Sequence, residues 1–280
     1  MTLLTVRDLR VTYPGDQGEF VAVRNLSFDL GRERLGIVGE SGSGKSTTGR
    51  AIMGLVPPPG RVTARELRLG DLDLRRLDAR GWRRVRGKRI AMVLQDPKFS
   101  LNPTMTVGRQ IAEAHAAHVG AGAAAARRAA LDMLQAVRID DPERVFRLYP
   151  HEVSGGMGQR VMIGMMLIAG PELLIADEPT SALDVTVQVQ VLAILDGLVR
   201  DRGMGLILIS HNLHLVGAFC DRVLVMYAGQ VVEECAAAEL AHARHPYTRG
   251  LLAALPTLAA PRAELPQLRR DPAWLLDVAS

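Results

Sequence analysis

The chain has 280 residues, of which 48% are hydrophobic and 23% charged, a composition typical of a folded globular protein and not of a disordered one. Its 34 basic and 30 acidic residues leave a net charge of +4, an excess too small to indicate nucleic-acid binding. Two cysteines, Cys220 and Cys235, are too few for a disulfide framework. The longest apolar stretch, residues 161–176, is interrupted by Pro171 and is too short for a membrane span, and the N-terminus shows no secretory signal.

The first part of the chain is predicted to be rich in strands. Apolar and polar residues mix from Leu4 to Val11 and alternate from residue 21 to Leu30, and the turn at Pro14-Gly15 separates the two stretches, which predicts antiparallel strands. Residues 34–38 form a short apolar strand that runs into a Gly/Ser loop, and a helix is expected from there to about residue 53. Beyond a break at 56–60, strand-like sequence continues to about residue 74.

Strands and helices alternate in the rest of the chain. Apolar strands are predicted over 90–94, 173–176 and 206–209, an amphipathic helix over 185–202, and a hairpin over 222–232 that turns at Ala228-Gly229. Residues 106–169 have a largely helical pattern. The alternation predicts an α/β protein with a mainly parallel sheet, and the insertion over about 97–169 is expected to form a helical subdomain.

The Gly/Ser loop matches the complete phosphate-binding pattern. Glycines allow consecutive backbone N–H groups to converge on phosphate oxygens, and the following helix adds the positive end of its dipole. Lys45 is expected to reach the β- and γ-phosphates and Ser46 to ligate Mg²⁺. A chance turn is disfavoured because the motif also requires the strand before it and the helix after it. The candidates for nucleotide binding here are Gly39, Ser41, Gly42, Gly44, Lys45, Ser46 and Thr47.

Two adjacent acids, Asp177 and Glu178, end the strand predicted over 173–176. On an extended chain neighbouring side chains point to opposite sides, so the two acids are expected to take different tasks. Asp177 suits the Mg²⁺ shell, and Glu178 suits a general base that activates the attacking water. The alternative is a pair of solvated loop residues, which the phosphate-binding loop upstream disfavours.

The stretch Val153-Ser154-Gly155-Gly156-Met157-Gly158-Gln159-Arg160, together with these motifs, resembles the ABC ATPase family. Its pattern is similar to the family signature LSGGQ, with Val153 in place of Leu and Met157 in place of Gln. Ser154 and the backbone amides of Gly155 and Gly156 are expected to grip a γ-phosphate at a helix start. Taken alone, Ser154 could be a simple helix N-cap.

The resemblance implies further site residues. Gln95 matches the Q-loop glutamine that contacts Mg²⁺ and water, and His211 matches the switch histidine near the γ-phosphate. Asp184 belongs to a segment, Ser181–Asp184, that resembles the D-loop at the dimer interface. Tyr13 stands where the family places an aromatic ring that stacks on adenine, although a tyrosine in a strand also serves packing alone.

The resemblance also implies a fold and a mechanism. The fold is a P-loop NTPase (RecA-like) core with an antiparallel β subdomain and an α-helical subdomain. Residues 1–240 are expected to form the ABC ATPase domain and 241–280 a C-terminal extension. Two subunits would face head to tail with each ATP between the phosphate-binding loop of one and the signature of the other. Hydrolysis through Glu178 would reopen the dimer and drive membrane partners.

Two segments resemble the dipeptide, oligopeptide and nickel importer branch of the family: the extended Q-loop Gln95–Pro103 and the later segment His245–Leu252. This resemblance implies two transmembrane permeases, a second and non-identical ATPase subunit, an extracytoplasmic solute-binding protein acting indirectly, and a peripheral place on the cytoplasmic face of the inner membrane. No cysteine follows Cys235, so no iron–sulfur cluster is expected.

Two other functions are the alternatives. The first is a cytosolic ABC ATPase that acts on DNA or ribosomes instead of transport, but such proteins commonly carry coiled coils, zinc modules or two fused cassettes. The second is a phosphate-loop kinase, against which the signature argues.

Overall fold

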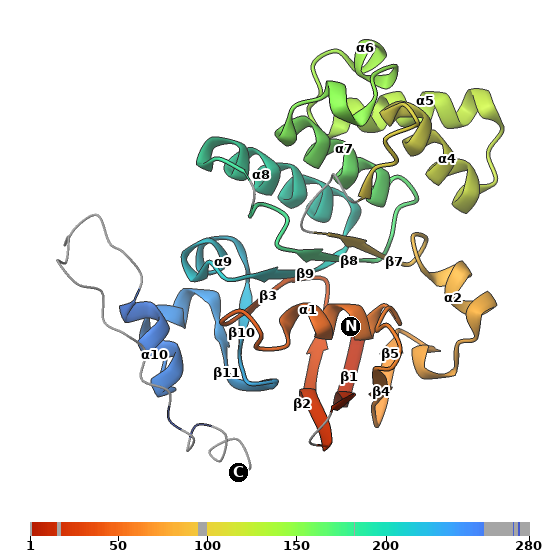
Figure 1. Ribbon diagram of the computed structural model, residues 1–280. Coiled ribbons are helices and arrows are strands. Elements are labelled where there is room, and N and C mark those ends of the chain that lie inside the picture. The colour runs from red at the N-terminus through yellow and green to blue at the C-terminus, as the bar shows by residue number, and fades with distance from the viewer. Residues whose placement is uncertain are drawn as a thin grey trace. The chain divides into compact units, whose positions relative to one another are not determined.

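Figure 1 draws the computed structural model of the chain, which describes residues 2–15, 18–94, 100–181, 183–254, 271 and 274. These residues form two compact units, one within Met1–Arg76 and Ile207–Ser280 and the other within Leu77–Leu206. Each unit has a buried core, with side chains such as Ile37 in the first and Leu174 in the second fully enclosed. Within the described residues, no helix is long and apolar enough to cross a membrane.

The N-terminal sheet of the first unit is antiparallel. Its strands follow the order β2-β1-β5-β6, and β4 also pairs with β1. Leu4 lies opposite Leu30, and every second residue from Leu26 to Leu30 is buried, as expected for a strand with one face on a core. The elements of this region are β1 (Leu4–Gly15), β2 (Gly18–Leu30), β4 (Arg61–Thr63), β5 (Glu66–Leu69), β6 (Leu72–Asp73) and the 3₁₀ turn η1 (Leu74–Arg76).

A second sheet of the first unit carries the phosphate-binding loop. In this sheet β3 lies between β10 and β9, and β11 lies beyond β10. The β10 strand runs parallel to β3 and antiparallel to β11. Helix α9 approaches β3 so closely that a Cβ on Gly36 would sit 2.1 Å from Cγ1 of Val216. The elements are β3 (Arg34–Val38), α1 (Lys45–Ile52), β9 (Gly205–Ser210), α9 (Leu213–Phe219), β10 (Arg222–Tyr227), β11 (Gln230–Ala236), η3 (Ala237–His242) and α10 (Pro246–Ala253).

The second unit is mainly helical. Its strands β7 and β8 are parallel, and all their residues are buried, which matches sequences that are apolar throughout except for Asp177 at the end of β8. Helix α7 packs against β7 and against α4, α5 and α8 (Figure 1). The elements are α2 (Ala79–Val85), β7 (Ile90–Val93), α4 (Val107–Val119), α5 (Ala123–Ala136), α6 (Pro142–Phe146), η2 (Pro150–Glu152), α7 (Gly155–Leu167), β8 (Leu173–Asp177) and α8 (Val185–Arg202).

Most of the predicted elements are confirmed. The strand over 34–38 and the helix over 185–202 have the bounds that the sequence indicates, the hairpin turns at Ala228-Gly229, and 106–169 is largely helical. Helices α2, α9 and α10 were not predicted. The domain boundaries at 97, 169 and 240 stay predictions.

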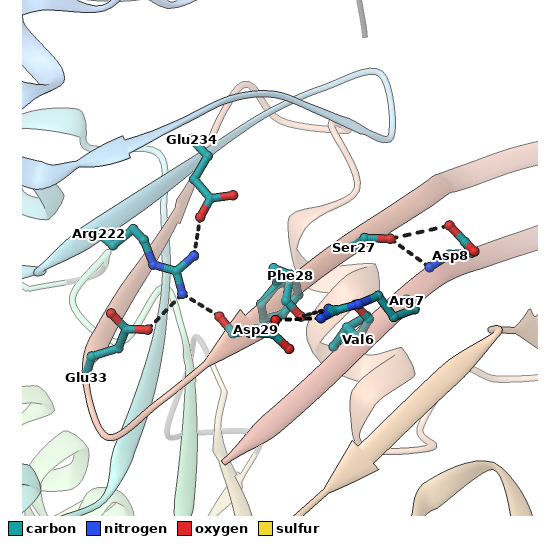
Figure 2. Close-up of polar contacts among 9 residues, drawn as sticks. All are labelled: Val6, Arg7, Asp8, Ser27, Phe28, Asp29, Glu33, Arg222 and Glu234. Carbon is teal, nitrogen blue, oxygen red and sulfur yellow. Dashed lines mark hydrogen bonds and ion pairs between the residues drawn. The ribbon is translucent and has the colours of Figure 1, made fainter. Parts of the chain in front are cut away.

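An arginine of β10 ties the two sheets of the first unit together (Figure 2). Arg222 donates hydrogen bonds to Glu33 at 2.8 Å, to Glu234 on β11, and to the backbone carbonyl of Asp29 near the end of β2. Burial by itself would lower the pKa of Arg222, but its hydrogen bonds to the two glutamates outweigh burial, and the pKa is raised overall. The two glutamates therefore compensate the Arg222 charge, and the hydrogen bonds of Arg222 connect β2 with β10 and β11.

Candidate nucleotide-binding and hydrolysis site

The phosphate-binding loop follows β3 directly and ends at the first residue of α1. Gly39, Gly42 and Gly44 have φ values of 151°, 81° and 97°, which L side chains rarely adopt. The surrounding space adds a second restriction. A Cβ on Gly39 would sit 2.2 Å from the carbonyl oxygen of Met226, and one on Gly44 would sit 2.5 Å from the carbonyl oxygen of Ala22. The loop therefore has a backbone that requires glycine at these two positions.

Lys45 is folded back over the loop that precedes it. Its Nζ donates hydrogen bonds to the carbonyl oxygens of Gly39 at 2.8 Å and Glu40 at 2.7 Å, and the residue is only 6% exposed. The ammonium thus lies beside the N-terminus of α1, where the helix dipole also favours an anion. The loop, together with Ser46 and Thr47 in the first turn of α1, can therefore bind phosphate.

The turn of the β10–β11 hairpin supports the loop. The backbone N–H of Gly229 donates to the carbonyl oxygen of Ser43 at 3.0 Å, and that of Arg24 donates to the carbonyl oxygen of Gly229 at 2.7 Å. The sequence predicts this turn but gives no sign that it contacts the loop, since the two segments are far apart along the chain. A cavity of about 190 Å³ beside the loop is lined by residues 40–43, Tyr227 and Ala228.

Two further candidates of the first unit lie outside the loop. His211 is exposed and directly follows β9, the neighbour of β3 in the sheet. The next residue, Asn212, caps α9 by accepting a hydrogen bond from the Leu215 N–H at 3.1 Å. Tyr13 on β1 is half-buried and packs on Gly60, where a Cβ would lie 2.6 Å from the Cε1 of the tyrosine. Packing therefore accounts for part of the Tyr13 ring, and its adenine contact stays a prediction.

The second unit carries the two acids. Asp177 is the last residue of β8 and is 6% exposed. Glu178 is half-buried and has a φ of 48°, a left-handed backbone that is uncommon outside glycine. The N–H and the hydroxyl of Ser181 donate to the Glu178 carbonyl at 3.3 Å and 3.2 Å and close the turn. The expectation of an extended chain through both acids is wrong, because the strand ends at Asp177 and the backbone turns at Glu178.

The signature of the second unit lies at the start of α7. The Ser154 hydroxyl accepts a hydrogen bond from the Met157 N–H at 3.3 Å, so Ser154 is the N-cap. The amides of Gly155 and Gly156 belong to the first turn, where N–H groups have no acceptor within the helix and the dipole is positive. The N-cap and anion-binding interpretations of Ser154 are therefore compatible.

The D-loop lies beside the signature. Exposed Asp184 caps α8 by accepting a hydrogen bond from the Val187 N–H at 3.0 Å. Val187 also contacts the signature, since a Cβ on Gly156 would lie 2.8 Å from its Cγ1. Gln188 donates from its side-chain amide to two carbonyls of the D-loop region, including that of Thr180 at 3.1 Å. Gln188 belongs to no motif, so its place under the D-loop could not be read from the sequence.

Comparison with known proteins decides the family. The family model described as ABC transporter matches residues 23–181, more than half of the chain. The chain belongs to the ABC transporter family. It is 47% identical to the dipeptide transport ATP-binding protein DppD of Haemophilus influenzae, over 96% of this chain and 82% of the relative. It is 49% identical to the oligopeptide transport ATP-binding protein OppD of Bacillus subtilis, over 91% of this chain and 72% of the relative.

Solved structures agree with this assignment. The dimeric post-hydrolysis state of the ATP-binding cassette MJ0796, bound to ADP and Pi, matches with a TM-score of 0.74 at 26% identity, over 84% of this chain and 98% of that chain. The predicted fold, an ABC-type P-loop core with antiparallel β and α-helical subdomains, is confirmed. The protein is an ATPase of the ABC type. Of its predicted site residues, Gln95 lies outside the described residues, as does Ala182 of the D-loop.

One contact with the phosphate-binding loop of this ABC ATPase is not predicted by any nucleotide-binding motif. The backbone N–H of Glu40 donates a hydrogen bond to the hydroxyl of Tyr247 at 3.0 Å, across 207 positions of sequence. The segment His245–Leu252 resembles the importer branch, but none of its residues is predicted to belong to the nucleotide site. The only signal was that the segment resembles that branch at all.

Proposed function

We propose that this ABC ATPase powers the uptake of dipeptides or oligopeptides through two membrane permeases, as a peripheral subunit on the cytoplasmic face of the cell membrane. The observation that carries the proposal is the extent of the likeness to DppD, which spans 96% of the chain and so reaches beyond the residues 23–181 that the general family model matches. An extracytoplasmic solute-binding protein would select the cargo, and a second, non-identical ATPase subunit would complete the dimer. Nickel, free or chelated, stays a predicted alternative cargo.

In the proposed reaction the loop of the first unit binds the phosphates of ATP. Its N–H groups and the Lys45 ammonium compensate the phosphate charge, and the Tyr13 ring contacts adenine. Ser46 and Asp177 offer hydroxyl and carboxylate oxygens, the hard donors that Mg²⁺ prefers, and they would hold the ion together with Gln95. A bound Mg²⁺ would offset negative charge on the phosphates.

Glu178 is the proposed general base. It would take the proton of the attacking water, and His211 would orient the groups around the γ-phosphate. Ser154 and the amides of Gly155 and Gly156 would bind the γ-phosphate held by the other subunit. Asp184 lies at the proposed interface between the subunits.

Exposed apolar residues support this subunit interface. Val185 and Val189, in the first five residues of α8, are 76% and 62% exposed. Apolar side chains in such a position favour burial by a partner. A second ATPase subunit would supply that partner.

Growth and fractionation together test the proposal. Cells that need an imported peptide for an essential amino acid should stop growing on the peptide when the chain carries Lys45→Ala, and should still grow on the free amino acid. The wild-type chain and the variant should both purify from membranes together with the permeases. A chain that purifies without permeases, and whose Lys45→Ala variant leaves peptide uptake intact, would instead be a cytosolic non-transport ABC ATPase.

A further inference from the structure

Helix α10, which follows the cassette core, buries an aromatic residue in the first unit. Tyr247 is fully enclosed, and its ring centroid lies 4.6 Å from that of Tyr227 and 5.8 Å from that of Trp274. The helix start is fixed by His245, whose Nδ1 accepts a hydrogen bond from the Tyr247 N–H at 3.2 Å. The N–H groups of Arg244 and His245 donate to the Glu233 carboxylate on β11, so α10 is also tied to the sheet.

The Tyr247 hydroxyl reaches the phosphate-binding loop. It accepts the hydrogen bond from the Glu40 N–H at 3.0 Å. This N–H belongs to the same peptide unit as the Gly39 carbonyl, which accepts a hydrogen bond from Lys45 Nζ at 2.8 Å. A peptide unit is planar, with its N–H and C=O pointing in opposite directions. Fixing the N–H on Tyr247 therefore also fixes the carbonyl that holds the lysine.

The peptide between Gly39 and Glu40 needs such support. Gly39 has a φ of 151°, and the position of its missing Cβ is 2.2 Å from the Met226 carbonyl oxygen and 2.8 Å from Ser43 Oγ. Glycine has more freedom to rotate than any other residue, so its conformation must be fixed by the groups around it. The Tyr247 hydroxyl is one of these groups.

We propose that Tyr247 is a positioning residue for ATP binding, acting through the peptide between Gly39 and Glu40 on Lys45. Helix α10 would then be a structural part of the nucleotide site. This inference rests on the proposed role of residues 39–46 as the phosphate-binding loop. It predicts that loss of the hydroxyl weakens ATP binding and leaves the chemical step intact, because Tyr247 touches neither the water nor Glu178 in the proposed reaction.

Steady-state ATP hydrolysis by the full-length Tyr247→Phe variant tests the inference. Phenylalanine keeps the ring packing and removes the hydrogen-bond acceptor. The KM for ATP should rise about five- to tenfold, the loss expected when a partly buried N–H is deprived of one acceptor, and kcat should stay within about twofold. A fluorescent ATP analogue should show the same weakening in its Kd. A five- to tenfold fall in kcat with no change in KM would overturn the inference.

Thr248→Val is the matched control. Thr248 is the next residue of α10, is fully buried, and its Oγ1 has no hydrogen-bond partner among the described residues. This variant also removes a buried hydroxyl from α10, yet it should leave the KM for ATP unchanged. If Thr248→Val raises KM as much as Tyr247→Phe does, the effect comes from packing of α10 and the inference is wrong.

Two further measurements separate the inference from the proposed site. Lys45→Ala should abolish binding of the ATP analogue. If the Lys45→Ala variant binds the analogue normally, the proposed phosphate-binding role of the loop is wrong, whatever Tyr247 does. If Lys45→Ala fails to bind and Tyr247→Phe binds like the wild type, only the inference on Tyr247 fails. In the wild-type protein, amide hydrogen exchange at Glu40 should be slow, and exchange at the rate of a free loop would contradict the hydrogen bond without any variant.

Discussion

The glycines of the phosphate-binding loop differ in what restricts them. Gly39 has both a positive φ and a carbonyl oxygen 2.2 Å from the position of a Cβ, whereas at Gly42 the φ of 81° is positive but no described atom lies within 4 Å of that position. Gly39→Ala should therefore lower the free energy of unfolding by about 2–4 kcal/mol, from strain and overpacking together. Gly42→Ala should cost only about 1–2 kcal/mol, from the backbone alone. Urea unfolding measures both, and equal losses would contradict the steric difference.

The two thiols should react slowly. Burial raises the pKa of the Cys220 thiol to about 12. Burial is also the main reason why the pKa of Cys235 is raised, and acidic neighbours such as Glu233 raise it further. The Cys220 thiol keeps its proton to a higher pH in the folded than in the unfolded chain. Its contribution to stability is therefore fully present below the ordinary thiol pKa of about 8.5, and it is lost as the pH rises toward 12. At pH 8, in single-cysteine variants, iodoacetamide should label Cys220 more slowly than half-buried Cys235, and both more slowly than the urea-unfolded chain. Equal rates in folded and unfolded protein would contradict the effect of burial.

Among the elements, the contact of β2 with β10 and β11 depends on Arg222. The side chain is 22% exposed and joins Glu33, Glu234 and the Asp29 carbonyl. Arg222→Met should lower the free energy of unfolding by about 2 kcal/mol, because charged hydrogen-bonding groups lose their partner. Arg65→Met is the control, since the ion pair of Arg65 with Asp8 lies on the surface and should contribute less than about 1 kcal/mol. Equal losses in urea unfolding would remove the role assigned to Arg222.

The elements that the sequence predicts are those with a pattern of their own. Strand β8 is apolar up to its last residue, Asp177, and α8 is followed by Gly203, which has the left-handed backbone typical of a helix end. Helices α9 and α10 are seven and eight residues long and have little periodicity to detect. Local caps form them, Asn212 for α9 and His245 with Pro246 for α10, and tertiary packing holds them in place. A search for hydrophobic periodicity does not detect short helices of this kind, because tertiary packing and not the sequence pattern determines where they form.

At the scale of the whole molecule, the sequence predicts the motifs and their order but not the contacts between distant segments. The phosphate-binding loop, the acids after β8 and the signature each carry their chemistry within a few consecutive residues. The supports of the loop, Gly229 and Tyr247, lie 186 positions from Ser43 (229 − 43) and 207 positions from Glu40, and neither belongs to a motif of the nucleotide site. The left-handed backbone of Glu178 could likewise not be predicted from the sequence, because tertiary structure and not residue type imposes it.

The proposed dimer predicts an effect of Val189 on association. Val189→Glu should leave the free energy of unfolding within about 0.5 kcal/mol, since the side chain is exposed, yet should raise the subunit concentration needed for half-maximal ATPase activity roughly tenfold. Val119→Glu, at a 56% exposed valine at the end of α4, is the control and should change neither quantity. An unaltered concentration dependence in Val189→Glu would argue against an interface at the start of α8.

ATP hydrolysis by Glu178→Gln is the most direct measurement of the central claim, that this chain is an ABC ATPase whose general base is Glu178. The amide keeps the size of the side chain and cannot accept the proton. In the complex with its permeases and partner ATPase, with the intact Glu178 chain as reference, turnover at sites that use this residue should fall by about a hundredfold or more, while ATP binding is retained and holds the dimer closed. Unchanged turnover in Glu178→Gln would contradict the assignment.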